Sequence, residues 1–239
     1  MAITRRLLIA AASALPAASL AHAQTAPAQT APAQIAPAQI APAEPTPTQT
    51  APAQTAPAQA APDADPRMTD RMLGSPDAKV LVTEWFSLTC THCAAFQKDT
   101  FPQVREKLID TGRVRYVWRD YPLDQVALTA AMVARALPAE RYEPFISALL
   151  ASQDRWAFAR GVNATEELAK LAALAGMSRD TFLLTVGDAK LKQAILTAQE
   201  TAEKKSKVTS TPSFVINDKL VAGAVPYAEF AKAVEAAAA

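Results

Sequence analysis

Two cysteines separated by two residues are the feature that most restricts what this chain can fold into. Cys90 and Cys93 are the only cysteines among its 239 residues, and they follow an apolar run with the pattern of a β-strand. This spacing places two thiols on the first turn of a helix, where they can close a small disulfide and reopen it. Thiol–disulfide exchange proceeds by thiolate attack through a mixed disulfide, so one cysteine should be unusually acidic and exposed.

A permanent disulfide or a metal site would use the same two cysteines. A disulfide across two intervening residues closes too small a loop to stabilise the fold much through loop entropy. Structural zinc usually takes four Cys or His ligands, and His92 is the only histidine after residue 22. Covalent haem attachment needs a histidine directly after the second cysteine, where this chain has Ala94. The sequence therefore favours a redox-active pair with no metal or cofactor.

Residues 1–23 have the pattern of a secretory signal peptide. Arg5 and Arg6 give the positive start, residues 7–20 are mostly apolar, and Ala21-His22-Ala23 places small residues around a cleavage point. The apolar run is shorter than the roughly 20 residues that span a membrane, which favours cleavage after Ala23 over an uncleaved anchor. The two arginines leave ordinary secretion and twin-arginine export both open. Export predicts an oxidising compartment, and we expect the periplasm.

Residues 24–65 form a linker dominated by an Ala/Pro/Gln repeat of about five residues. Proline near every fifth position blocks a helix. Ile35 and Ile40 are the only large apolar side chains of the repeat and cannot form a core, so we expect a disordered linker. A five-residue unit without a buried face cannot stack as a solenoid. An inert linker is favoured over a working spacer. Mixed charges with a net charge of +1 give no indication of a nucleic-acid partner.

Residues 66–239 have the length of one ordinary domain. The apolar patterns in it predict the order β-α-β, then a helical block, then β-β-α. We expect strands at 79–86 and 113–121, a helix at 90–109 that is interrupted near Pro102, helices between 123 and 207, strands at 213–217 and 220–222 joined by a turn at Asn217-Asp218, and a helix at 228–237.

The helical block carries its own starting signals. One apolar stripe begins at Leu123 and continues through Val126, Ala127, Ala130, Val133 and Ala134. Further helices are expected to begin near Thr165 and near Met177-Ser178, and another to cover about 189–205. Lys204, Lys205 and Lys207 are interpreted as a solvated helix face.

Three segments carry a resemblance to a known family: Trp85 to Ala94 (WFSLTCTHCA), Arg119 to Leu123 (RDYPL) and Thr211 to Phe214 (TPSF). Together with the element order, they resemble the thioredoxin superfamily, and within it the DsbA-like branch. The resemblance covers about 74–239. It implies an α/β, thioredoxin-like fold with an inserted helical subdomain at about 123–207.

The roles of the residues around the cysteine pair follow from position and from this resemblance. Cys90 is expected to be the nucleophile because a helix N-terminus favours an anion, and Cys93 to resolve the mixed disulfide. The resemblance implies that His92 stabilises the Cys90 thiolate; the alternative is an exposed histidine that shapes the docking surface. Thr91 departs from the proline often found there in DsbA-like oxidases, and it is expected to contact substrate.

Two further positions complete the predicted site. Glu84 lies on an apolar strand face six residues before Cys90, where thioredoxin-like proteins commonly keep a buried acid. Burial would raise its pKa and let it exchange a proton with Cys93; the alternative is a solvated or paired strand-end charge. Pro212 resembles the cis-proline that faces the cysteine pair in this superfamily, and Thr211 before it is expected to offer its backbone to an extended substrate.

The function expected from these features is a periplasmic thiol–disulfide oxidoreductase that donates disulfides to exported proteins with cysteines. The resemblance implies reoxidation by a membrane quinone-linked thiol oxidase. An isomerase or reductase of the same fold, the latter fed by a transmembrane reductant, stays open. The N-terminal region lacks heptads, which favours a monomer over the oligomers typical of periplasmic isomerases. A non-catalytic binding or chaperone domain is the third alternative.

Overall fold

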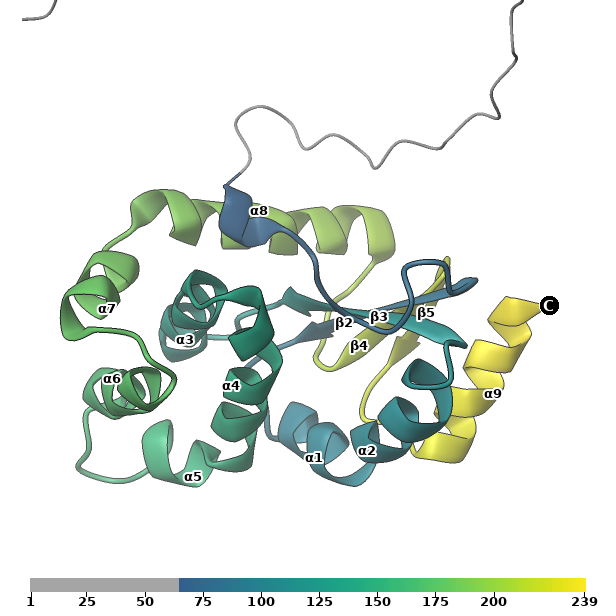
Figure 1. The fold of residues 1–239 in the computed structure, drawn as a ribbon, viewed down its shortest axis with the longest axis horizontal. Coiled ribbons are helices and arrows are strands. Elements are labelled where there is room, and N and C mark those ends of the chain that lie inside the picture. Colours follow the sequence, from purple (N-terminus) through teal and green to yellow (C-terminus); the bar gives the residue numbers. More distant parts are fainter. Residues whose placement is uncertain (1–64) are drawn as a thin grey trace, which may run out of the picture. The chain divides into compact units, whose positions relative to one another are not determined.

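The computed structural model describes residues 65–239. The predicted signal peptide at 1–23 and all but the last residue of the predicted linker at 24–65 lie outside the described residues. The described chain folds around a five-stranded mixed sheet that helices cover on both faces (Figure 1). None of its helices is long and apolar enough to cross a membrane.

The sheet has the strand order β1-β3-β2-β4-β5. The strands are β1 (Arg71–Leu73), β2 (Val80–Phe86), β3 (Val114–Asp120), β4 (Ser213–Ile216) and β5 (Lys219–Ala222). The central strand β2 is parallel to β3 and antiparallel to β4. The register pairs Glu84 with Trp118 on one side and with Phe214 on the other. Glu84 is therefore enclosed by neighbouring strands on both sides.

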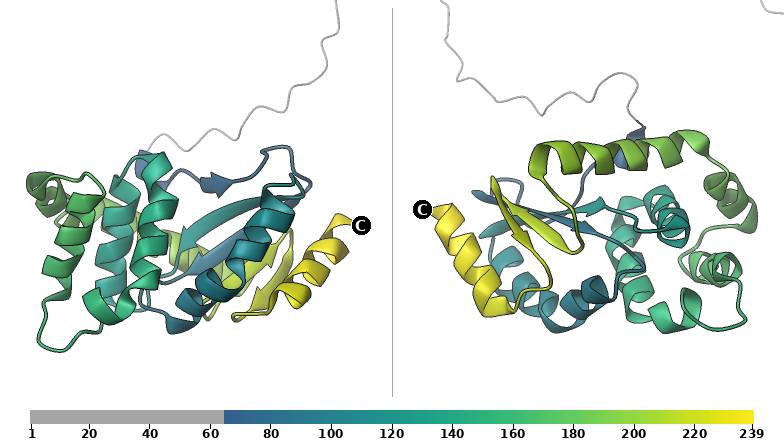
Figure 2. Two further views of the ribbon diagram at one scale, coloured as in Figure 1. Left: turned by 60° about the horizontal axis from the view of Figure 1, so that its bottom comes forward. Right: turned by 180° about the vertical axis from the view of Figure 1, so that it is seen from behind.

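The helices follow in chain order. They are α1 (Thr91–Asp99), α2 (Phe101–Val104), α3 (Gln125–Ala136), α4 (Ala139–Ala151), α5 (Gln153–Trp156), α6 (Ala164–Leu174), α7 (Arg179–Val186), α8 (Ala189–Ser206) and α9 (Tyr227–Ala238). A short 3-10 turn, η1 (Pro66–Met68), precedes β1, and a π-helical turn, η2 (Arg105–Ile109), follows α2. Figures 1 and 2 show α1, α2 and α9 on one face of the sheet and α8 on the other.

Aromatic side chains fix the cysteine-bearing helix α1 to the sheet. The ring of Phe96 in α1 lies 4.5 Å from the ring of Phe214 in β4 and 5.8 Å from that of Phe230 in α9, measured between centroids. All three side chains are buried. Contacts of this kind add to the free energy of burial, so the start of α1 is held at the carboxyl end of β2.

The helices from α3 to α7 lie together at one end of the sheet (Figure 2). A buried ion pair joins them to β3: Arg135 of α3 donates to Asp120 at 2.6 Å, and both side chains are nearly inaccessible. The hydroxyl of Tyr142 in α4 donates to the same carboxylate at 3.3 Å. The charge of Asp120 is therefore compensated by groups from two inserted helices.

The predicted fold class is confirmed, because a thioredoxin-like sheet carries a helical insertion. The break expected near Pro102 is present, since α1 ends at Asp99 and Pro102 occupies the first turn of α2, where its missing N–H costs no hydrogen bond. The turn at Asn217-Asp218 also forms, with Asn217 at φ 50°.

Three details differ from the prediction. Leu123 does not join the apolar stripe: it precedes α3, whose N-cap is Asp124, and it is 53% exposed. The helix expected to begin near Thr165 is capped by Asn163, whose side-chain oxygen accepts from two backbone N–H groups. Strand β1 was not predicted, because three residues are too few to show an alternating pattern.

Candidate active site

Cys90 is the N-cap residue of α1, directly after the turn that follows β2. Its backbone is extended, with φ −82° and ψ 118°, and no side chain caps this helix end. The backbone N–H groups at the start of α1 are therefore available to the Cys90 sulfur. Both cysteines are present as free thiols in this structure.

The two thiols differ sharply in acidity. A hydrogen bond from the Cys93 thiol, together with the Thr211 side chain and the backbone N–H groups of Cys93 and His92, lowers the pKa of Cys90 to about 5 against the opposing effect of burial. Burial raises the pKa of Cys93 well above its usual value, and the nearby Cys90 and Glu84 add to this. At neutral pH the pair therefore holds one thiolate, on Cys90, and one proton, on Cys93.

The nucleophilic cysteine predicted from the sequence, Cys90, is less exposed to solvent than expected. Cys90 is only 7% exposed, and Cys93 is completely enclosed. The reason is the loop before β4, which lies against Cys90: in its protonated form, the Cys90 thiol donates to the carbonyl oxygen of Thr211 at 3.3 Å. The loop therefore covers one side of the Cys90 sulfur.

The peptide bond between Thr211 and Pro212 is cis, as expected. Both residues are buried. The Thr211 hydroxyl makes no hydrogen bond of ordinary geometry, although its proximity lowers the pKa of Cys90. This loop and the start of α1 come from distant parts of the chain and form one surface around the Cys90 sulfur.

Glu84 is buried, with 2% of its surface exposed, rather than a solvated strand-end charge. Burial raises its pKa to about 7, although the Tyr116 hydroxyl donates to its carboxylate at 2.8 Å. The negative charge of Glu84 also adds to the raised pKa of Cys93, after burial and the neighbouring Cys90. A carboxyl group that titrates near neutrality beside a buried thiol is suited to proton exchange with it.

His92 and Thr91 are both exposed on the first turn of α1. The His92 backbone N–H is among the groups that lower the pKa of Cys90. The imidazole makes no hydrogen bond or ion pair among the described residues. Both side chains lie on the surface next to Cys90, and their contact with substrate and a role of the imidazole charge stay predictions.

The loop between β2 and Cys90 is held by residues that the sequence did not point to. Thr89 donates from its hydroxyl to Asp124 at 2.7 Å, and the same carboxylate caps α3 through the N–H of Ala127. Gln153 of α5 donates to the carbonyl oxygens of Leu88 and Cys90. No local pattern could have indicated Gln153, because it lies 63 residues from Cys90. The contact of Tyr116 with Glu84 could have been predicted only from the register between β2 and β3.

Comparison with known proteins agrees with this geometry. A protein-family model described as thioredoxin matches residues 67–236. The chain belongs to the thioredoxin family. Among solved structures, alpha-DsbA1 of Wolbachia pipientis is 32% identical to this thioredoxin-family chain, with a TM-score of 0.65 over 72% of this chain and 92% of that one. The match places the chain in the DsbA-like branch.

Other relatives of this DsbA-like chain differ in sequence identity and in the share of their length that matches it. A provisionally named protein-disulfide oxidoreductase from Rickettsia bellii is 30% identical over 149 residues. That match covers 62% of this chain and 57% of the relative, so the chain spans little more than half the length of the curated relatives that it matches. A structure titled as a protein-disulfide isomerase from Novosphingobium aromaticivorans is 24% identical, with a TM-score of 0.61, and shows the fold alone.

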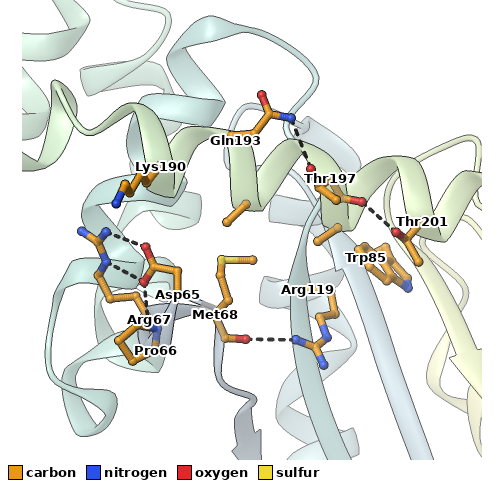
Figure 3. Close-up of a pocket in the computed structure, with 12 residues that line it drawn as sticks. Asp65, Pro66, Arg67, Met68, Trp85, Arg119, Lys190, Gln193, Thr197 and Thr201 are labelled. Carbon is orange, nitrogen blue, oxygen red and sulfur yellow. Dashed lines mark hydrogen bonds and ion pairs between the residues drawn. The ribbon is translucent and has the colours of Figure 1, made fainter. Parts of the chain in front are cut away.

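A groove of about 1420 Å³ lies apart from the dithiol in this DsbA-like domain. It opens between η1, the sheet and α8, and Figure 3 shows Met68 and Arg119 on one side with Gln193 and Thr197 of α8 across from them. Trp85 also lines it, on the opposite face of β2 from Glu84. None of the residues around Cys90 lines the groove, so it is not part of the redox site.

Proposed function

We propose that this chain is a periplasmic thiol–disulfide oxidoreductase that donates the Cys90–Cys93 disulfide to exported proteins. The observation that carries this proposal is the pairing of an acidic thiol at a helix N-terminus with a buried thiol whose pKa is raised. A thiolate that is stable at neutral pH is a good leaving group, and it makes the reduced form favourable and the disulfide oxidising.

Disulfide donation then takes two exchange steps. A substrate thiolate attacks the Cys90 sulfur, the Cys90–Cys93 bond breaks, and Cys93 leaves with the electron pair and takes up a proton. A second substrate thiolate attacks the substrate sulfur of the mixed disulfide, and Cys90 leaves as the thiolate. The substrate loses two electrons to the cysteine pair, which becomes a dithiol.

Glu84 is proposed to supply the proton that Cys93 needs. Its pKa of about 7 lets it hold a proton near neutral pH and recover it afterwards. The carbonyl oxygen of Thr211 faces the reacting sulfur, and we propose that this loop receives an extended substrate segment. Exposed Thr91 and His92 would meet the same substrate.

The cellular setting of the proposal rests on the sequence patterns. Residues 1–23 are proposed to be a cleaved signal peptide, 24–65 a linker, and 66–239 the folded domain with its helical insertion at about 123–207. Reoxidation is assigned to a membrane quinone-linked thiol oxidase. Fractionation of cells that express the full chain tests the location; an unprocessed protein that stays in the cytoplasm would contradict it.

The reduction potential of the Cys90–Cys93 couple tests the direction of the reaction. Equilibration in glutathione buffers, with thiol alkylation as the readout, should give a value near about −120 mV for a disulfide donor. A value near about −270 mV would make donation unfavourable and would indicate a reductase fed by a transmembrane reductant.

Two further measurements separate the remaining alternatives. Light scattering is expected to give the mass of a monomer, and a stable oligomer would favour a disulfide isomerase. The Cys90→Ser variant should lose all oxidation of a reduced, unfolded substrate protein. Unchanged function of that variant would identify the protein as a binding or chaperone domain instead.

A further inference from the structure

The side chain of Gln153 bridges two backbone carbonyl groups beside the nucleophilic cysteine. Its Nε2 donates to the carbonyl oxygen of Leu88 at 2.9 Å and to that of Cys90 at 3.0 Å. A primary amide has two N–H donors, and both are used here. The two carbonyl groups lie before Thr89 and after Cys90, so one side chain holds the backbone on both sides of this dipeptide.

Gln153 is itself held in place. It is the first residue of α5, only 6% of its surface is exposed, and its carbonyl oxygen accepts from the N–H groups of Ala157 and Phe158. Trp156, on the same short helix, is buried and donates from its indole to the carbonyl oxygen of Leu149 in α4 at 2.8 Å. The amide is thus presented to the loop from a packed part of the helical insertion.

The two acceptors depend on Gln153 to different degrees. The Cys90 carbonyl also accepts the first helical hydrogen bond of α1, from the N–H of Ala94 at 3.1 Å. The Leu88 carbonyl has no further partner among the hydrogen bonds of residues 65–239. Loss of the amide would leave a buried carbonyl unsatisfied and free the loop to move, and both changes act directly before the reactive sulfur.

We propose that Gln153 is a positioning residue of the redox site, which holds the Leu88–Cys90 backbone so that the Cys90 sulfur stays at the N-terminus of α1. This inference rests on the proposed function, because it assumes that Cys90 is the nucleophile. The amide also opposes the partial negative charge of two carbonyl oxygens near that sulfur. The helical insertion therefore sets the chemistry of a cysteine that belongs to the thioredoxin sheet.

The test compares Gln153→Met with wild type. Methionine has a similar length and shape but no N–H donor, so it keeps the packing of α5 and removes both hydrogen bonds. The Cys90 thiolate is titrated by its ultraviolet absorbance, and the reduction potential is measured in glutathione buffers. We expect the Cys90 pKa of the variant to rise by about one unit. The equilibrium constant between the reduced and the oxidised form then falls by up to about tenfold, which corresponds to a reduction potential lower by about 30 mV.

Gln97→Met is the matched control. Gln97 lies on α1 and donates to Ser147 of α4 at 2.9 Å, so it too joins the cysteine-bearing helix to the insertion, but it does not touch the loop before Cys90. This variant is expected to keep the wild-type pKa and potential. An equal shift of the Cys90 pKa and the potential in both variants would overturn the positioning role. The shift would then follow from the loss of any contact between α1 and the insertion, not from Gln153 in particular.

Two outcomes distinguish failure of this inference from failure of the proposed function. A folded Gln153→Met variant with the wild-type pKa and potential would overturn the inference alone. A wild-type protein whose Cys90 has an ordinary thiol pKa would overturn the proposed function and the inference with it. If Gln153→Met does not fold, Gln153→Asn, which is one methylene shorter, should withdraw the amide and shift both values in the same direction; unshifted values would again overturn the inference.

Discussion

The acidity of Cys90 is the property on which the proposed chemistry of this molecule depends. Several neighbours produce it together: the Cys93 thiol, the Thr211 side chain and two backbone N–H groups. Each of them acts on the thiolate over a short distance, inside a site from which most water is excluded. Removing one of them should therefore change the pKa measurably without destroying the site.

Replacing Thr211 by valine should raise the pKa of Cys90. A hydrogen bond to a charged group is worth about 1.5–3 kcal/mol, and one pKa unit is 1.36 kcal/mol, so the nonideal contact of this hydroxyl should give a rise of about one unit. The stability of the oxidised form should not fall, because that form has no Cys90 thiolate and the hydroxyl makes no hydrogen bond of ordinary geometry. Thiolate absorbance against pH measures the effect. Thr209→Val, at an exposed position of the same loop, should leave the pKa unchanged.

Glu84 should make the oxidised protein less stable as the pH rises. Its folded-state pKa of about 7 lies above the usual value, so the folded state holds the proton more tightly than the unfolded state. The contribution of protonated Glu84 to the free energy of unfolding is therefore fully present below about pH 4.5 and is lost as the pH rises through about 7. This contribution amounts to roughly 3 kcal/mol. The oxidised form is the one to measure, because the Cys90 thiol does not titrate in it.

The Glu84→Gln variant should show no such pH dependence between pH 4.5 and 7 in urea unfolding of the oxidised protein. Glutamine keeps an acceptor for the Tyr116 hydroxyl and cannot ionise. Glu106→Gln, at an exposed position on η2, should retain the wild-type slope. Parallel curves for wild type and Glu84→Gln would contradict the burial of this carboxyl group.

Individual elements are joined across the sheet by buried polar groups as well as by apolar packing. Helix α3 is attached to β3 through Arg135 and Asp120, and to the loop before Cys90 through Asp124. The first contact secures the insertion, and the second connects it to the site.

Arg135→Met should lower the free energy of unfolding by about 3–5 kcal/mol, because the Asp120 carboxylate would remain buried without its partner. Urea unfolding followed by circular dichroism measures this loss. Lys204→Met, which removes an exposed ion pair with Glu200, should change stability by less than about 1 kcal/mol. Similar losses in the two variants would mean that Asp120 and Arg135 do not form an interior pair.

The sequence was informative at the level of elements wherever a pattern is local. Alternation placed Glu84 on an apolar strand face, and Pro102 marked the break between α1 and α2. The sequence-based prediction was wrong for Leu123, because a periodic apolar stripe does not show at which residue its helix begins. Gln153 and Asp124 reach the site only through the tertiary fold, and no spacing along the chain encodes that contact.

At the scale of the whole molecule, the redox state and the stability of the fold are linked. The lowered pKa of Cys90 stabilises the folded dithiol form, and the disulfide form has no corresponding gain. Reduction should therefore raise the melting temperature, although a disulfide ordinarily stabilises a protein.

This difference between reduced and oxidised melting temperatures should depend on pH. The Cys90 contribution is complete above the pKa of an unfolded thiol, near about 9, and disappears as the pH falls through the folded value of about 5. Differential scanning calorimetry at pH 5, 7 and 9, with and without reductant, should show the difference growing with pH. A higher melting temperature for the oxidised form at all three values would contradict the acidic Cys90.

The groove between η1, the sheet and α8 matters for the discovery of inhibitors. With a volume of about 1420 Å³ it can hold a small molecule, so compounds selected by affinity alone could collect in it, and Trp85 would report their binding by fluorescence. Because the groove opens on the face of β2 opposite Glu84 and neither cysteine lines it, a compound bound there would not cover the Cys90 sulfur. A screen against this protein should therefore score inhibition of disulfide transfer rather than occupancy.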